Sequence, residues 1–138
     1  MINIKNYKAY VFDFDGVVMD TENLHFKAWN KGFEILGDTL TEEEYLPLKS
    51  TGRKHIVNTF AAKIGREISE DEALRICEIK DDYFKELCKS IDKSLLIKGV
   101  EDFLVKLRSE DKKIAVASSA STTITQQGGA YKIFFGCC

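Results

Sequence analysis

The stretch AYVFDFDGVVMDTE, residues 9–22, decides the fold of this chain. Its first four residues are apolar and favour β-structure, and they lead directly into two aspartates and a glycine. A short apolar run that ends at a Gly turn is typical of a buried strand in a parallel sheet. Residues 114–117, IAVA, form a second run of this kind and lead into Ser118 and Ser119. We therefore expect two buried strands, at residues 9–12 and 114–117.

The sequence between these two strands is helical in pattern. Apolar residues at helical spacing and stop signals predict helices over residues 22–36, 53–64 and 69–91, with another after Gly99. Thr41 with Glu44 and Ser69 with Glu72 have the spacing of capping boxes, and Pro47 interrupts or ends the short helix that follows Thr41. Residues 131–135 are apolar enough for a third strand.

Two similar strands so far apart indicate one sheet that contains a helical insertion. The predicted fold class is α/β, with a partial Rossmann-like parallel sheet. We expect residues 1–19 and 93–138 to form an incomplete core, and residues 20–92 to form the inserted helical domain.

The bulk composition is that of an ordinary soluble protein. The chain has 138 residues, 20 basic and 22 acidic side chains and a net charge of -2, which favours neither nucleic acid nor an anionic membrane as a partner. No apolar run is long enough to span a bilayer, and residues 1–8 lack the apolar stretch of a signal peptide, so a cytoplasmic location is expected. Cys77 and Cys88 lie too far apart on one predicted helix to form a disulfide, and reduced thiols are expected throughout.

The segment DFDGVVMDTE, residues 13–22, carries the chemistry. A calcium-binding loop is one alternative for its first residues, but such a loop needs Glu at its twelfth position, where this chain has Leu24. The segment resembles the first motif of the haloacid dehalogenase superfamily, and it matches the pattern D-x-D-G-[VT]-x-x-[DN]-[ST] at every position.

This resemblance implies an aspartyl-phosphate mechanism. Asp13 would be the nucleophile, and Asp15 would be the general acid and base. The Asp13 carboxylate and the backbone carbonyl of Asp15 would contribute ligands to Mg²⁺. The presence of Asp15, the second aspartate of this motif, favours phosphate chemistry over dehalogenation. Ser118 and Ser119, after the second strand, correspond to the second motif and would bind a phosphoryl oxygen.

Residues in the helical insertion resemble the β-phosphoglucomutase-like branch. Its pattern includes Thr21, His25 and Trp29, and it implies that His25 lies near the acid and base. Arg53 resembles a residue of the substrate-specificity loop, placed for a second phosphate, and Lys80 resembles a substrate-facing lysine of the cap. A structural histidine and an ordinary solvated lysine are the alternatives for His25 and Lys80.

Other positions depart from the pattern of that branch. Residues 120–122, AST, stand where the mutases have Ser-Lys-Asn, which argues against mutase activity. The third-motif lysine has no counterpart, because Lys132, the only lysine after Ser118, lies too close to it. The fourth-motif acidic pair has none, because no Asp or Glu follows Asp111. We expect this chain alone to bind Mg²⁺ weakly, to turn over poorly and to self-associate through an open edge of the sheet. An engineered fragment, a truncated gene product and half of a split protein are all compatible with this pattern.

Two functional hypotheses follow. The first is a Mg²⁺-dependent phosphohydrolase or phosphomutase that acts on a small phosphorylated metabolite such as a sugar phosphate. The second is a catalytically inactive remnant, or a partner-dependent half, with a binding role or none. The sequence does not identify the substrate or the oligomeric state.

Overall fold

The computed structural model describes residues 6–117, and the chain divides into two compact units. The sheet unit comprises residues up to 21 and from 88 onward, and the helical unit comprises residues 22–87. The chain thus enters and leaves the helical unit between two parts of the sheet unit. Ser118, Ser119 and the predicted third strand at residues 131–135 lie outside the described residues.

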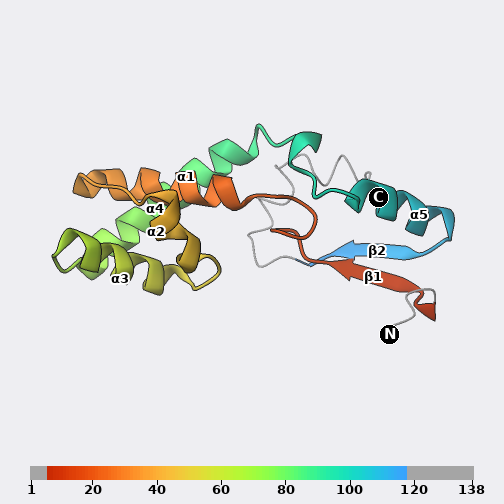
Figure 1. Cartoon of the computed structure of the whole chain (residues 1–138), viewed down its shortest axis with the longest axis horizontal. Helices are drawn as coiled ribbons and strands as arrows, with labels where there is room; N and C mark the ends of the chain where they lie inside the picture. The colour runs from red at the N-terminus through yellow and green to blue at the C-terminus, as the bar shows by residue number, and fades with distance from the viewer. Residues whose placement is uncertain (1–5, 118–138) are drawn as a thin grey trace. The chain divides into compact units, whose positions relative to one another are not determined.

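The described part of the sheet unit contains two parallel strands and one long helix. Strand β1 (Ala9–Phe12) pairs with β2 (Lys113–Val116), with Ala9 opposite Lys113 and Phe12 opposite Val116. Helix α5 (Val100–Ser109) follows a short 3-10 turn, η4 (Lys93–Leu95), and packs against this sheet (Figure 1). The two strands predicted at residues 9–12 and 114–117 and the predicted α/β class with a parallel sheet are confirmed.

The expectation that both strands are buried is wrong for the described residues. The Phe103 ring of α5 covers one face of β1, with ring centroids 6.2 Å from Tyr10 and 6.0 Å from Phe12. On the opposite face Val11 is 68% exposed. The physical reason is that α5 is the single described helix that packs against this small sheet, so only one of its faces is covered.

The helical unit consists of helices joined by short turns, and its predicted helices are confirmed to within a few residues. Its elements are α1 (Glu22–Phe33), η2 (Glu34–Leu36), α2 (Glu42–Tyr45), η3 (Leu46–Leu48), α3 (Arg53–Ile64) and α4 (Glu70–Cys88), of which α4 extends one residue into the sheet unit. Both predicted capping boxes are present: the Glu44 amide donates to Thr41 Oγ1 at 3.2 Å, and the Glu72 amide donates to Ser69 Oγ at 3.2 Å. None of the helices within residues 6–117 is long and apolar enough to cross a membrane.

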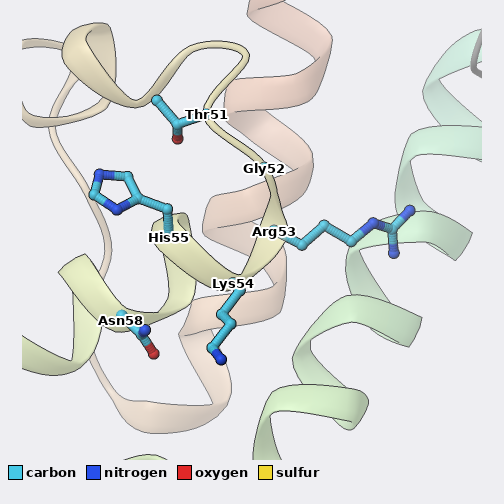
Figure 2. Close-up of a pocket in the computed structure, with 6 residues that line it drawn as sticks. All are labelled: Thr51, Gly52, Arg53, Lys54, His55 and Asn58. Carbon is cyan, nitrogen blue, oxygen red and sulfur yellow. The ribbon is translucent and has the colours of Figure 1, made fainter.

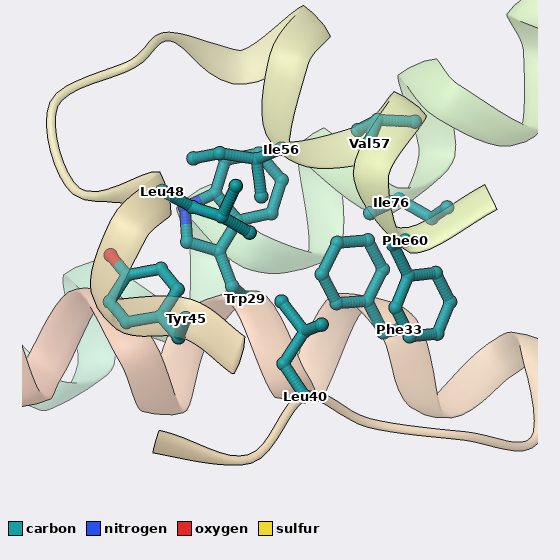
Figure 3. Packing of buried hydrophobic residues seen from close by; sticks show 9 residues of the cluster. All are labelled: Trp29, Phe33, Leu40, Tyr45, Leu48, Ile56, Val57, Phe60 and Ile76. Atoms are coloured by element: carbon teal, nitrogen blue, oxygen red, sulfur yellow. The ribbon is translucent and has the colours of Figure 1, made fainter. Parts of the chain in front are cut away.

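Aromatic side chains fill the core of the helical unit. Phe33 of α1 and Phe60 of α3 stack with their ring centroids 3.8 Å apart, and Trp29 lies 5.6 Å from Phe33 on the next turn of α1 (Figure 3). The cluster gathers side chains from all four helices and from the turns between them. Its members are Trp29, Phe33, Leu40, Tyr45, Leu48, Ile56, Val57, Phe60 and Ile76.

Helices α1 and α4 approach each other closely at Gly32. A Cβ atom at this position would lie 2.7 Å from the carbonyl oxygen of Ile76 and 3.1 Å from its Cγ2 atom. Real Cβ atoms essentially never come so close to a backbone oxygen, so any larger residue would push the two helices apart.

We expect Gly32→Ala to destabilise the protein by about 1–3 kcal/mol, through overpacking against Ile76. A loss of stability would be informative, because Gly→Ala at a position with open space inside a helix ordinarily stabilises a protein by roughly 0.5–1 kcal/mol. Urea denaturation followed by far-ultraviolet circular dichroism measures the change. Lys31→Ala, at the exposed neighbouring position, is the matched control and should change stability by less than about 1 kcal/mol. A more stable Gly32→Ala variant would contradict the close approach.

Candidate functional site

The acidic turn begins where β1 ends. Asp13 is the first residue after the strand, and its side chain is exposed. Its Oδ1 atom accepts a hydrogen bond of 2.7 Å from the Phe14 amide, and its Oδ2 atom has no hydrogen-bond partner among the described residues. The carboxylate is therefore oriented by its own backbone and accessible to a ligand.

Backbone hydrogen bonds fold residues 14–19 into a compact turn. The Gly16 amide donates to the Met19 carbonyl at 2.8 Å, and the Val18 amide donates to the Phe14 carbonyl at 3.0 Å. Gly16 has a φ of 72°, a left-handed backbone conformation that residues other than glycine rarely adopt. Phe14, Val18 and Met19 are buried and anchor the turn, so the two aspartates project from a rigid support.

The second aspartate is held by a buried hydroxyl. Thr21 Oγ1 donates to Asp15 Oδ1 at 2.5 Å, and Thr21 is only 1% exposed. A hydrogen bond to a carboxylate is stronger than one between neutral groups. Thr21 therefore positions the Asp15 carboxylate, which is itself half-buried.

The two chain segments that connect the units lie side by side within the sheet unit. The Asp20 amide donates to the Leu95 carbonyl at 2.7 Å, and the Ile97 amide donates to the Val18 carbonyl at 3.1 Å. These bonds join the end of the acidic turn to the segment that returns from α4. The turn is consequently braced from both directions along the chain.

The acidic turn offers hard oxygen donors. The Asp13 carboxylate and the oxygens of Asp15 are of the type that Mg²⁺ prefers, and Mg²⁺ commonly uses one or two carboxylates together with water and phosphate oxygens. Within residues 6–117 there is no group of three or more His, Cys, Asp or Glu side chains arranged around a common metal position. The donor set on the turn fits a partial Mg²⁺ site.

In the helical unit, two of the predicted substrate-binding cations meet at one carboxylate. Arg53, the first residue of α3, forms two hydrogen bonds with Asp81 of α4, at 2.8 Å and 3.0 Å. Lys80 Nζ lies 3.3 Å from Asp81 Oδ1. Burial lowers the pKa of Lys80, although Asp81 opposes this effect. The alternative of a solvated lysine is wrong, because the Lys80 side chain is only 8% exposed.

His25 lies in the same region of the helical unit. Its ring stacks on Phe84 with the centroids 4.1 Å apart, and Lys80 Nζ lies 4.9 Å from the centroid of the same phenyl ring. His25 and Lys80 therefore share one aromatic neighbour. The structure brings His25, Lys80 and Arg53 together in the helical unit, and it brings Asp13 and Asp15 together in the sheet unit.

A shallow hollow of about 390 Å³ lies at the start of α3. Its lining residues are Thr51, Gly52, Arg53, Lys54, His55 and Asn58 (Figure 2). The Arg53 side chain points away from His55 and toward α4, where it meets Asp81. Lys54 makes no ion pair within residues 6–117. The hollow thus has a basic rim, but its arginine, Arg53, forms an ion pair with Asp81 of the neighbouring helix α4.

The family model for haloacid dehalogenase-like hydrolases matches residues 10–129. The chain belongs to this family. The match covers the acidic turn, the helical unit and β2.

Relatives within the family include sugar-phosphate enzymes. The chain is 28% identical over 115 residues to a β-phosphoglucomutase of Bacillus subtilis (strain 168), a match that covers 82% of this chain and 51% of the relative. It is 31% identical over 113 residues to a phosphorylated carbohydrates phosphatase of Thermotoga maritima, with 81% and 50% covered. A crystal structure of β-phosphoglucomutase from Clostridium difficile matches with a TM-score of 0.68 and 26% identity, over 88% of this chain and 56% of that one. The chain spans about half the length of these curated relatives.

Asp81, which pairs with both Arg53 and Lys80, is not among the site residues predicted from the sequence. Asp81 is adjacent to Lys80 in sequence, but its contact with Arg53 joins residues 28 positions apart. A lysine followed by an acidic residue was the only local signal. Such a pair on a helix is ordinarily solvated, and only the packing of α3 beside α4 distinguishes this one.

We expect Thr21→Val to loosen the acidic turn. Valine keeps the shape of threonine but removes the donor to Asp15, and the loss should reduce the local opening free energy by about 1–2 kcal/mol. Amide hydrogen exchange at Gly16, Val18 and Met19 measures this local opening free energy. Thr21→Ser, which keeps the hydroxyl, is the control and should exchange more slowly than Thr21→Val. Equal exchange in both variants would show that the hydroxyl does not support the turn.

Proposed function

We propose that this chain carries the nucleophile and the general acid of a phosphohydrolase that acts on a small phosphorylated sugar through an aspartyl-phosphate. The observation that carries the proposal is the pair of aspartates at the carboxyl end of β1. One carboxylate is exposed, and the other is held by the buried Thr21 hydroxyl. The similarity to a phosphatase of phosphorylated carbohydrates supports a sugar phosphate as the substrate class.

The first step forms an acyl-phosphate. An Asp13 carboxylate oxygen attacks phosphorus, and the bond from phosphorus to the sugar oxygen breaks as Asp15 donates a proton to that oxygen. The exposure of Asp13 suits in-line approach of a phosphate. The position of Asp15 two residues further along the turn suits proton transfer to the leaving group.

The second step restores the enzyme. Asp15, now a carboxylate, takes a proton from a water molecule whose oxygen attacks phosphorus, and the bond to Asp13 breaks to release inorganic phosphate. The hydrogen bond from Thr21 keeps Asp15 in place during both proton transfers. Bound Mg²⁺, with the Asp13 carboxylate and the Asp15 carbonyl among its ligands, would offset the repulsion between phosphate and nucleophile.

The helical unit has a separate role in this proposal. Residues 20–92 would act as a cap that closes over the bound substrate and excludes water. His25, Arg53 and Lys80 would contact the substrate, with Arg53 taking a second anionic group. Ser118 and Ser119 would bind the transferred phosphoryl group.

Phosphoryl transfer between sugar positions is the second candidate activity, favoured by the similarity to β-phosphoglucomutases. Residues 120–122, AST, argue against it, because they replace the Ser-Lys-Asn of the mutases. Chromatography of the products separates the two activities: a hydrolase releases inorganic phosphate, whereas a mutase returns an isomeric sugar phosphate.

Asp13→Asn should abolish turnover of sugar phosphates in the presence of Mg²⁺, because an amide cannot form the acyl-phosphate. The exposed position implies a change in stability below about 0.5 kcal/mol. The assay is phosphate release over a panel of sugar phosphates, by this chain and by any longer natural protein that contains it. Mass spectrometry of rapidly acid-quenched protein tests for phosphate on Asp13. Undiminished turnover by Asp13→Asn would refute the proposed nucleophile.

Asp15→Asn should slow the hydrolysis of sugar phosphates by about 10²–10⁴-fold, because their alkoxide leaving groups need a proton. Hydrolysis of p-nitrophenyl phosphate, whose leaving group is a stable anion, should fall much less. Asparagine can still accept the hydrogen bond from Thr21, so the turn is preserved. Steady-state rates on both substrates show how much activity the variant loses on each. Equal losses on the two substrates would mean that Asp15 has only a structural role.

A further inference from the structure

Arg53, the candidate anion-binding residue of the helical unit, already holds an anion. The two oxygens of Asp81 accept from the two terminal nitrogens of Arg53, Nη1 to Oδ2 at 2.8 Å and Nη2 to Oδ1 at 3.0 Å. Guanidinium groups also use this bidentate geometry to bind phosphate. This edge of the guanidinium, formed by its two terminal nitrogens, cannot bind Asp81 and a second anion in the same way at once.

The Arg53–Asp81 pair is accessible to a ligand. The Arg53 side chain is 55% exposed and the Asp81 side chain is 31% exposed. Partial burial alone would raise the pKa of Asp81, but its bonds to Arg53 and the charges of Lys80 and Arg53 outweigh burial and lower it. Asp81 is therefore ionised at neutral pH and remains an effective partner for Arg53.

Lys80 gives Asp81 a second partner besides Arg53. Its Nζ atom lies 3.3 Å from Asp81 Oδ1, 4.9 Å from the centroid of the Phe84 ring and 5.6 Å from the centroid of the Trp29 ring. These contacts fix the ammonium group in a largely buried position. If the guanidinium exchanged Asp81 for another anion, the displaced carboxylate would keep its contact with Lys80. The exchange therefore leaves no charge without a partner.

We propose that Asp81 is a specificity-determining residue, which acts as an internal competitor for the guanidinium of Arg53. The inference rests on the proposed function, in which Arg53 takes a second anionic group of the substrate. An incoming group must replace two charge-assisted hydrogen bonds. A phosphate dianion meets this requirement better than a carboxylate, which carries a single charge and merely duplicates Asp81. The chemical class selected at Arg53 is thus a phosphate dianion.

If Asp81 positioned Arg53 for the substrate instead of competing for it, the removal of Asp81 would change the affinity for phosphate in the opposite direction. If Asp81 only positioned Arg53 for the substrate, its removal would release a mobile arginine and weaken anion binding. If it competes, its removal strengthens anion binding, because the guanidinium is available in a larger fraction of molecules. The effect of one substitution on the affinity for phosphate therefore separates the two roles.

The test is nuclear magnetic resonance of the Arg53 side-chain Nε–H group, titrated with inorganic phosphate and, separately, with acetate. Arg53→Lys assigns the signal by its disappearance. Asp81→Asn should lower the phosphate concentration at half-saturation by about three- to tenfold. It should also allow acetate to perturb Arg53 at concentrations that leave the unmodified protein unaffected.

Asp82→Asn is the matched control. It removes the same charge from the next residue of α4, where the side chain is 78% exposed and pairs with Lys85 at 3.1 Å. It should change the phosphate response less than twofold. Asp81→Glu, which keeps the competing charge, should respond to phosphate like the unmodified protein.

Several results would overturn the inference: unchanged or weaker phosphate binding by Asp81→Asn, an equal effect of Asp82→Asn, or no response of Arg53 to phosphate in any variant. Circular dichroism of each variant verifies that it is folded. The titration does not depend on turnover. Failure of the proposed function would appear instead as the absence of phosphate on Asp13 in quenched samples, so the two failures are distinguishable.

Discussion

The parallel pairing of β1 with β2 is the constraint on which the sheet unit depends. In a parallel pair both strands end at the same edge, so Asp13 after β1 and Ala117 after β2 leave the sheet together. The bond of 2.8 Å from the Ala117 amide to the Phe12 carbonyl holds that edge closed up to the acidic turn. Asp13 and Ala117, which follow the two strands, are therefore neighbours at one edge of the sheet.

In the proposed mechanism, the acidic turn would combine an accessible nucleophile, Asp13, with a firmly held acid and base, Asp15. Buried side chains anchor the turn, and Gly16 allows its sharp change of direction. Thr21 orients one carboxylate, whereas the other is left exposed. An acid or base that must move a proton at a fixed position benefits from such a hydrogen bond, and a nucleophile that must reach phosphorus benefits from exposure.

Local rules predicted most of the fold and the acidic turn. Strand β1, both capping boxes and the helix ends at Gly37 and Gly65 follow from short-range chemistry, and the structure confirms them. The exposure of Val11 was not predictable, because burial depends on which elements cover a strand. The role of Asp81 was not predictable for a related reason: its contact with Arg53 depends on tertiary packing between two helices.

The hydrogen bond between the Asp20 amide and the Leu95 carbonyl brings together the two ends of the inserted segment. An insertion whose ends are adjacent can be exchanged as a module, because the host chain needs only a tight turn to close without it. Recombination between relatives at these two positions would transfer a whole helical unit, with its own Arg53, Lys80 and Asp81, onto another sheet unit of the family. Under the proposed function, a single exchange of this kind would replace the residues that contact the substrate, while Asp13 and Asp15 stay unchanged.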